Sequence, residues 1–280
     1  MENLKLGILG LDSTHFDAFL EIFRNENIQL DLVFLRDDSS KVIERRISEY
    51  PELEDLFSEE PSICDCFMIM NRFGDDHIRS FKEIARFGKP TFIDKPIASS
   101  LQEAIEISKI AKEFNTPITS HSPLEFSKEF NEIKVTYRKM IESKEKSILI
   151  FSGPAECNDI GDDPRFKSPL FYGIHLSEML SNICSDDLKK ETPIHLDNRY
   201  ILPFKSGLND IFIDLYKNGP EFYCISIYNN KLGFKSYEIN LNGSYYTDYV
   251  EFLLKFFKND VETEFSKKSL RALSFLDEVI

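Results

Sequence analysis

The stretch Thr91-Phe92-Ile93-Asp94-Lys95-Pro96-Ile97-Ala98-Ser99-Ser100 joins a short apolar strand to an acid–lysine–proline turn. The next segment, 101–114, has apolar residues spaced three and four apart, and a serine before it can cap it as a helix. Lys95 therefore stands just past the C-terminal end of a buried strand, on a turn that Pro96 stiffens. Ligands bind at this edge of open parallel sheets. The alternative is an ordinary solvated lysine.

The pattern of this stretch extends over residues 1–122, where apolar strands alternate with helices. The sequence predicts strands at 4–9, 28–35, 63–70, 91–93 and 117–120, and helices between them. Alternation of this kind is typical of a doubly wound parallel sheet, so an α/β fold begins the chain. We expect residues 1–122 to form a Rossmann-type domain.

Residues 123–280 have a different pattern, with long helices followed by consecutive strands. Strands are expected at 147–154, 194–203, 210–217, 221–229 and 234–240, with helices at 126–143, 170–184, 246–257 and 266–279. This predicts a second α/β domain with a large, mainly antiparallel sheet. One face of such a sheet needs a cover, so we expect a homodimer or homotetramer. The aromatic candidates for that face are Phe212, Phe222, Tyr223, Tyr228 and Tyr237.

Composition limits the possible partners. The chain has 280 residues and a net charge of −14, which disfavours a nucleic-acid surface because phosphate binding needs a basic face. No apolar run approaches the roughly 18 residues of a membrane span. The odd number of cysteines, 5, and their lack of metal-finger spacing favour free thiols and a cytoplasmic protein. We expect no metal and no membrane partner.

The first strand leads into the turn Gly7-Ile8-Leu9-Gly10-Leu11-Asp12-Ser13-Thr14-His15. A strand, a glycine turn and a helix place a pyrophosphate at the helix N-terminus. Gly10 fits the first glycine of the dinucleotide fingerprint, but Asp12 and His15 stand at the second and third. The turn could bind a dinucleotide if Asp12 points away and the two hydroxyls donate to phosphate; alternatively it binds nothing.

An acidic pair follows the second strand. Asp37 stands at the spacing expected for an acid that binds the ribose hydroxyls, although it could equally be a solvated loop residue. Together with Asp38 it would repel a 2′-phosphate, which favours NAD, while Arg36 leaves NADP open.

With these motifs in their order, the sequence resembles the Gfo/Idh/MocA family of glucose–fructose oxidoreductase and inositol dehydrogenase, in a subgroup with an Asp-Ser-Thr-His first turn. The resemblance covers essentially the whole chain. Asp94-Lys95-Pro96 stands where the family has Glu-Lys-Pro, and 171–175 (Phe-Tyr-Gly-Ile-His) stands where it has Asp-x-Gly-x-His. Phe171 therefore replaces a family aspartate that touches the substrate and can share proton transfer.

The resemblance implies an NAD(P)-dependent oxidoreductase acting on a hydroxyl of a sugar, sugar nucleotide or cyclitol. Lys95 would bind the reacting hydroxyl and His175 would be the general base, the two facing each other across an interdomain cleft. Arg165, Phe171 and Tyr172 would meet the substrate. The implied cofactor site comprises Gly7, Gly10, Asp12, Ser13, Thr14, His15, Asp37, Asn71, His77, Asp94 and Pro96.

Other interpretations stay open for several of these residues. His175 could be a core histidine on an apolar helix face, and Arg165 a solvated loop residue. His175 and Glu178 lie one helical turn apart, but no further His or Cys follows at a metal-ligand spacing. Asp12 replaces a fingerprint glycine and Phe171 replaces a family aspartate. These two departures support a second hypothesis: a non-catalytic relative that acts as a nucleotide- or sugar-binding or regulatory protein.

Overall fold

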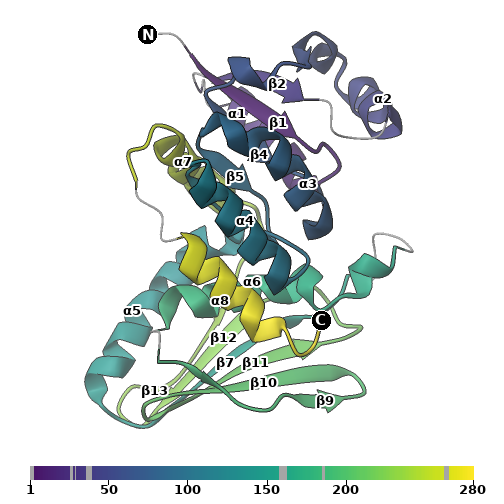
Figure 1. Ribbon diagram of the computed structural model, residues 1–280. Helices are drawn as coiled ribbons and strands as arrows, with labels where there is room; N and C mark the ends of the chain where they lie inside the picture. The colour runs from purple at the N-terminus through teal and green to yellow at the C-terminus, as the bar shows by residue number, and fades with distance from the viewer. Residues whose placement is uncertain are drawn as a thin grey trace. The chain divides into compact units, whose positions relative to one another are not determined.

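The computed structural model describes residues 3–25, 28, 30–35, 40–157, 163–184, 187–261 and 265–280 (Figure 1). The chain divides into two compact units: Met1–Ser120 with Tyr246–Ser266, and His121–Tyr245 with Lys267–Ile280. The division after residue 120 lies close to the expected 122. The segment 246–266, which the sequence analysis assigned to the second domain, belongs to the first unit.

The first unit contains a parallel sheet, as expected, and this sheet has six strands where the sequence predicted five. Its strand order is β3-β2-β1-β4-β5-β6, and neighbouring strands pair in parallel. The strands are β1 (Leu4–Leu9), β2 (Leu30–Leu35), β3 (Phe57–Ser58), β4 (Cys66–Ile69), β5 (Thr91–Ile93) and β6 (Ile118–Thr119). They are near-continuous apolar runs because both faces of such a sheet are covered. The short β3 is not among the strands expected from the sequence.

Helices cover this sheet. They are α1 (Thr14–Asn25), α2 (Ser40–Glu49), α3 (Gly74–Ile84), α4 (Leu101–Glu113) and α7 (Tyr245–Phe257). Helices α3 and α4 lie side by side (Figure 1). Helix α7 joins this unit because the Tyr249 ring lies 5.6 Å from Phe19 of α1 and 5.7 Å from Phe92 of β5, centroid to centroid.

The second unit is a mixed, mainly antiparallel sheet of seven strands with helices on one face. The strands are β7 (Ser147–Pro154), β8 (Lys189–Lys190), β9 (Ile194–Leu196), β10 (Arg199–Ser206), β11 (Asn209–Tyr216), β12 (Cys224–Asn229) and β13 (Gly233–Glu238). Two details differ from expectation. The expected strand 194–203 is a hairpin of β9 and β10, which turns at residues 197–198, and β7 pairs with β11 in parallel.

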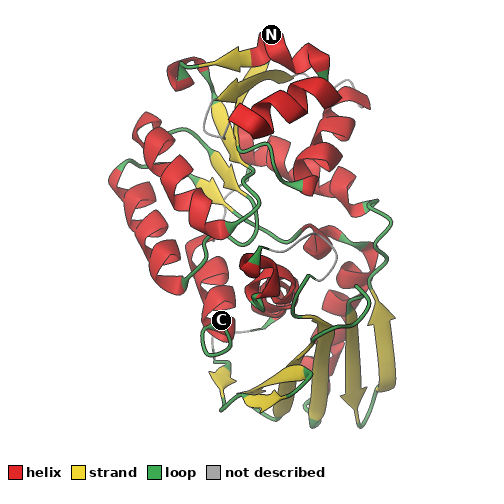
Figure 2. Cartoon of the chain, turned by 90° about the vertical axis from the view of Figure 1, so that its right-hand side faces the viewer, coloured by secondary structure: helices red, strands yellow, loops and turns green. Residues whose placement is uncertain are grey.

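The helices of this unit are α5 (Lys128–Ser143), α6 (Leu170–Ile183) and α8 (Phe265–Leu276), with the short turns η4 (Pro123–Phe126) and η5 (Pro164–Lys167). They lie on one side of the sheet, and the part of the chain that the structure describes places no helix on the other side (Figure 2). Phe212 and Tyr228 face this bare side, as expected, since they pair with Ile150 and Ile148 of β7.

The expectation for Tyr223 and Tyr237 is wrong, because both belong to the helix-covered face. Tyr223 is only 1% exposed, and the Tyr237 hydroxyl hydrogen-bonds Thr136 of α5 at 2.6 Å. Alternation along the strand explains the error: Tyr223 has the parity of buried Ile225 and Ile227, opposite to that of Tyr228.

Candidate functional site

The acid–lysine–proline turn lies at the C-terminal end of β5 and is buried. Asp94 is 2% exposed and Lys95 is 6% exposed, and the Lys95–Pro96 peptide bond is cis. The Asp94 backbone N–H donates to the carbonyl of Ile69 at 2.9 Å, which ties the turn to the end of β4. Lys95 is therefore not a solvated surface lysine.

Asp94 accepts hydrogen bonds from the first turn of the unit. The Nδ1 atom of His15 lies 2.9 and 2.8 Å from the two carboxylate oxygens of Asp94, and the Ser13 hydroxyl lies 3.4 Å from one of them. Burial opposes ionisation of Asp94, but the charge and hydrogen bond of His15, with Lys95 and His77 nearby, outweigh it and hold the pKa of Asp94 below its ordinary value.

Ser13 also begins helix α1, because its hydroxyl accepts the backbone N–H of His15 at 3.1 Å. Thr14, the first helical residue, is exposed.

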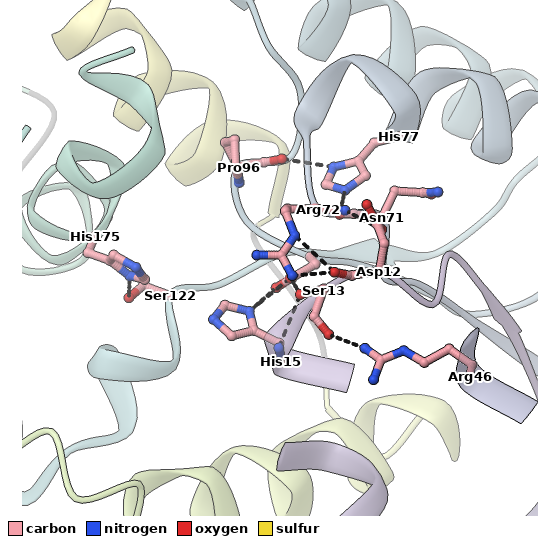
Figure 3. A network of polar contacts seen from close by, with 11 residues as sticks. Asp12, Ser13, His15, Arg46, Asn71, Arg72, His77, Pro96, Ser122 and His175 are labelled. Carbon is pink, nitrogen blue, oxygen red and sulfur yellow. Dashed lines mark hydrogen bonds and ion pairs between the residues drawn. The ribbon is translucent and has the colours of Figure 1, made fainter. Parts of the chain in front are cut away.

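The Asp12 carboxylate is turned toward the loop after β4. One of its oxygens accepts the backbone N–H of Arg72 at 2.9 Å, and the Arg72 guanidinium donates through Nε to the Asp12 carbonyl, also at 2.9 Å (Figure 3). The negative charge that replaces the second fingerprint glycine thus has protein partners. Of the two conditions expected for a usable turn, the first is met because Asp12 bonds elsewhere, whereas the Ser13 hydroxyl donates to Asp94.

A buried arginine from α2 holds the same turn from the other side. Arg46 donates to the carbonyls of Leu11 at 2.5 Å and Ser13 at 3.2 Å, and to the Asp17 carboxylate at 2.7 Å. Its guanidinium also lies 5.1 Å from the centre of the Phe16 ring. Five donors in a rigid fork suit such simultaneous binding of carbonyls and a carboxylate. The path of the turn is therefore specified by protein groups.

The glycines of this region serve close packing. Gly10 has φ +81°, and a Cβ there would lie 2.3 Å from the backbone nitrogen of Asn71. Gly7 lies inside β1, where a Cβ would meet the Phe67 ring at 2.7 Å. Gly10 therefore lets the ends of β1 and β4 approach each other.

Asn71 and His77 are buried residues that join neighbouring loops. Asn71 is 3% exposed and its carbonyl faces His77 Nε2 at 2.7 Å, while His77 Nδ1 faces the Pro96 carbonyl at 2.8 Å (Figure 3). His77 therefore links the end of β4 to the turn that carries Lys95. Asp37 lies outside the described residues.

His175 lies on α6 in the second unit and is 5% exposed. Its Nδ1 atom lies 2.6 Å from the hydroxyl of Ser122, which also accepts the Leu124 backbone N–H and caps η4 (Figure 3). When Nδ1 carries the proton and donates to Ser122, Nε2 is the ring nitrogen that carries the lone pair. A general base needs this arrangement.

Aromatic side chains surround His175. The Tyr223 ring lies 5.3 Å from the imidazole at 75°, and the Tyr172 ring lies 6.4 Å from it. Burial and hydrogen bonds to the Cys157 and Glu221 side chains raise the pKa of Tyr172. Phe171 packs between Phe166 and Tyr172, each 5.1 Å away between ring centres.

Arg165 lies on the exposed turn η5, where it pairs with its neighbour Asp163 at 2.8 Å. Within the part of the chain that the structure describes, no group of three or more His, Cys, Asp or Glu side chains could hold a metal ion. No helix of the described residues is long and apolar enough to cross a membrane. All five cysteines are free.

Four residues of these networks were not expected there: Arg46, Arg72 and Ser122, and Tyr223, which was expected on the open face of the second sheet. The pattern Ser122-Pro123-Leu124-Glu125 signals a capping box, which is present, but it does not reveal the bond to a histidine 53 positions away. No local pattern singles out the other three.

The comparisons with known proteins point to one fold. No family model and no curated protein matches the sequence. Among solved structures, a Gfo/Idh/MocA family oxidoreductase from Vibrio cholerae is 16% identical, with a TM-score of 0.71, over 98% of this chain and 96% of that one.

Two further structures were determined with ligands. An oxidoreductase from Agrobacterium radiobacter, in complex with NAD+, L-tartaric acid and magnesium, is 12% identical, with a TM-score of 0.75 over 99% and 95% of the two chains. The WlbA dehydrogenase from Thermus thermophilus, in complex with NAD and UDP-GlcNAcA, is 13% identical, with a TM-score of 0.69 over 98% and 94%. Over nearly its whole length, the chain has the fold of the Gfo/Idh/MocA oxidoreductases.

Proposed function

We propose that this protein is an NAD(P)-dependent oxidoreductase that acts on a hydroxyl group of a sugar, sugar nucleotide or cyclitol. The observation that carries the proposal is the buried Asp94-Lys95 pair at the C-terminal end of β5, in a fold shared with oxidoreductases crystallised with NAD. Lysine is rarely buried, so a buried lysine at the ligand-binding edge of a parallel sheet is a candidate for function.

The residues of the first turn fit a dinucleotide. The C-terminal ends of β1, β4 and β5 lie next to each other, and α1 starts directly after β1, so its N-terminus can bind a pyrophosphate. Asp12 does not obstruct it, because its carboxylate bonds the Arg72 N–H. We propose that residues 10–15 hold the pyrophosphate, that Asp37 binds the adenosine ribose, and that NAD is preferred over NADP.

The chain's own residues would handle the oxygen and the proton. NAD(P), when bound, supplies the hydride acceptor or donor. The Lys95 ammonium would stabilise the developing negative charge on the substrate oxygen. His175 Nε2 would take the hydroxyl proton while Nδ1 donates to Ser122, which holds the imidazole in the required tautomer.

The alternative, a binding or regulatory relative without turnover, is supported by Phe171. Its ring packs between Phe166 and Tyr172 and offers the substrate an apolar wall where the resembled family has an acid. Tight NADH binding without turnover of any polyol would favour this alternative.

The test combines calorimetry with NADH and NADPH and an assay of NAD+ reduction with sugars, sugar nucleotides and cyclitols. Lys95→Ala and His175→Ala should each lower turnover by about a hundred- to ten-thousand-fold with the fold intact. Matched controls are Lys82→Ala, an exposed lysine of the first unit, and His195→Ala, an exposed histidine of the second. Failure to bind either dinucleotide at millimolar concentration would overturn the proposal.

We also propose a homodimer or homotetramer, formed through the bare face of the second sheet, and a cytoplasmic location. Exposed Ile148, Tyr228 and Phe234 on that face support the oligomer, and the free thiols support a reducing compartment. A monomer mass in light scattering at micromolar concentration would contradict the oligomer.

A further inference from the structure

Tyr223 is a buried tyrosine beside His175 whose hydroxyl has no hydrogen-bond partner in the part of the chain that the structure describes. It lies just before β12 and is 1% exposed, and its ring meets the imidazole edge to face at 5.3 Å. Its backbone is held, since its carbonyl accepts the Ile239 N–H at 2.8 Å. Among the described residues, however, nothing bonds its Oη atom.

The Tyr223 ring packs closely on Gly153 of β7. A Cβ at that position would stand 2.9 Å from the Tyr223 ring and 3.1 Å from Leu176. A glycine in this central strand thus makes space for the tyrosine.

An unpaired buried hydroxyl destabilises the folded state, and most buried polar atoms in native proteins have partners. The pKa of Tyr223 is raised well above its ordinary value by burial and by the neighbouring Glu221, Tyr172, Tyr216 and Tyr245. The hydroxyl therefore keeps its proton and remains a donor. It is suited to an acceptor that arrives with a ligand.

We propose that the Tyr223 hydroxyl binds the substrate, by donating a hydrogen bond to a hydroxyl oxygen of a sugar or cyclitol ring placed next to His175. This inference rests on the proposed function and adds a residue that binds the substrate in the second unit. Three observations support the proposal together: the unpaired Tyr223 hydroxyl, the contact of its ring with His175, and the space that Gly153 leaves for the ring.

The first measurement is the melting temperature of the ligand-free Tyr223→Phe protein. It should equal or exceed that of the wild type, because no bond is lost and a desolvated hydroxyl is removed. The matched control is Tyr137→Phe: Tyr137 is also buried, but its hydroxyl bonds the Cys184 thiol, so its loss should lower the melting temperature. If Tyr223→Phe lowers the melting temperature as much as Tyr137→Phe does, the proposal is overturned.

The second measurement is calorimetry of myo-inositol, D-glucose, D-glucitol and UDP-glucose in the presence of NADH. Tyr223→Phe should weaken the best of these about ten-fold, the loss of one hydrogen bond, and leave NADH affinity unchanged. Equal affinity in the two proteins, or no binding of any probe to the wild type, would overturn the proposal. NADH binding to the wild type reports separately on the proposed function.

Discussion

In the first unit, the polar groups of the turn at residues 12–15 bond other protein groups, whereas in the second the Tyr223 hydroxyl is buried without a partner among the described residues. Asp12 bonds Arg72, and His15 bonds Asp94. The difference indicates two ways of building a binding site. The turn is organised by protein groups, while beside His175 the Tyr223 hydroxyl has no partner among the described residues, and we propose that a ligand supplies one.

Gly10→Ala is the strongest test of the preorganised turn. A left-handed backbone costs a non-glycine residue about 1–2 kcal/mol, and the contact with the Asn71 nitrogen adds overpacking of about 1–3 kcal/mol. The free energy of unfolding, measured in urea, should fall by the sum of the backbone cost and the overpacking cost. Gly233→Ala is the control: its φ is +74° and a Cβ meets nothing within 4 Å, so only the backbone cost applies. Equal losses in both variants would contradict the role of the Asn71 contact.

Arg46→Ala removes the guanidinium that binds the carbonyls of Leu11 and Ser13. We expect a loss of about 2–4 kcal/mol in the free energy of unfolding, because two buried carbonyls lose charge-assisted bonds. NADH affinity should fall with it. The control is the adjacent Arg45→Ala, whose side chain is 53% exposed against 6% for Arg46. If the free energy of unfolding changes by less than about 0.5 kcal/mol, as for an ordinary surface substitution, the turn does not depend on the Arg46 guanidinium.

Asp94→Asn tests the turn by pH. The pKa of folded Asp94 lies below its unfolded value of about 3.9. Its ionisation therefore stabilises the fold above that value, and this contribution is lost as the pH falls through the folded pKa. The variant should lose about 1–2 kcal/mol at pH 7.

The urea concentration at the midpoint of unfolding is measured between pH 5 and pH 3. As the pH is lowered, this midpoint should fall less steeply for Asp94→Asn than for the wild type. Asp31→Asn, at an exposed acid in β2, serves as the control. Parallel curves for the wild type and Asp94→Asn would contradict the stabilising role of this carboxylate.

Ser122→Ala has the smallest expected effect and tests the second region. Loss of a helix cap costs about 1 kcal/mol, and the same holds for the control Ser127→Ala, which caps α5 through the Phe130 N–H. Only Ser122→Ala should also shift the pH dependence of the His175 imidazole signals in NMR spectra. If both variants leave that titration unchanged, Ser122 acts as a cap alone.

Local sequence patterns determined the outline of this protein. Strand–helix alternation predicted the parallel sheet, since buried parallel strands are short apolar runs, and the predicted strands 4–9, 91–93 and 147–154 match the structure to the residue. The position of Lys95 past a strand end was likewise readable, because the apolar run stops at Asp94 and Pro96 follows. These features depend on residues close together in the chain.

Only the tertiary structure decided which polar groups meet. The Arg46 guanidinium reaches a carbonyl 33 positions away, and Ser122 a histidine 53 positions away. Helix α7 returns to the first unit because its aromatic residues pack on Phe19 and Phe92. Periodicity shows which face of an element is buried, but the partner of a buried polar atom depends on how the elements pack. For that reason the bonded state of Asp12 and the unpaired hydroxyl of Tyr223 became visible only in three dimensions.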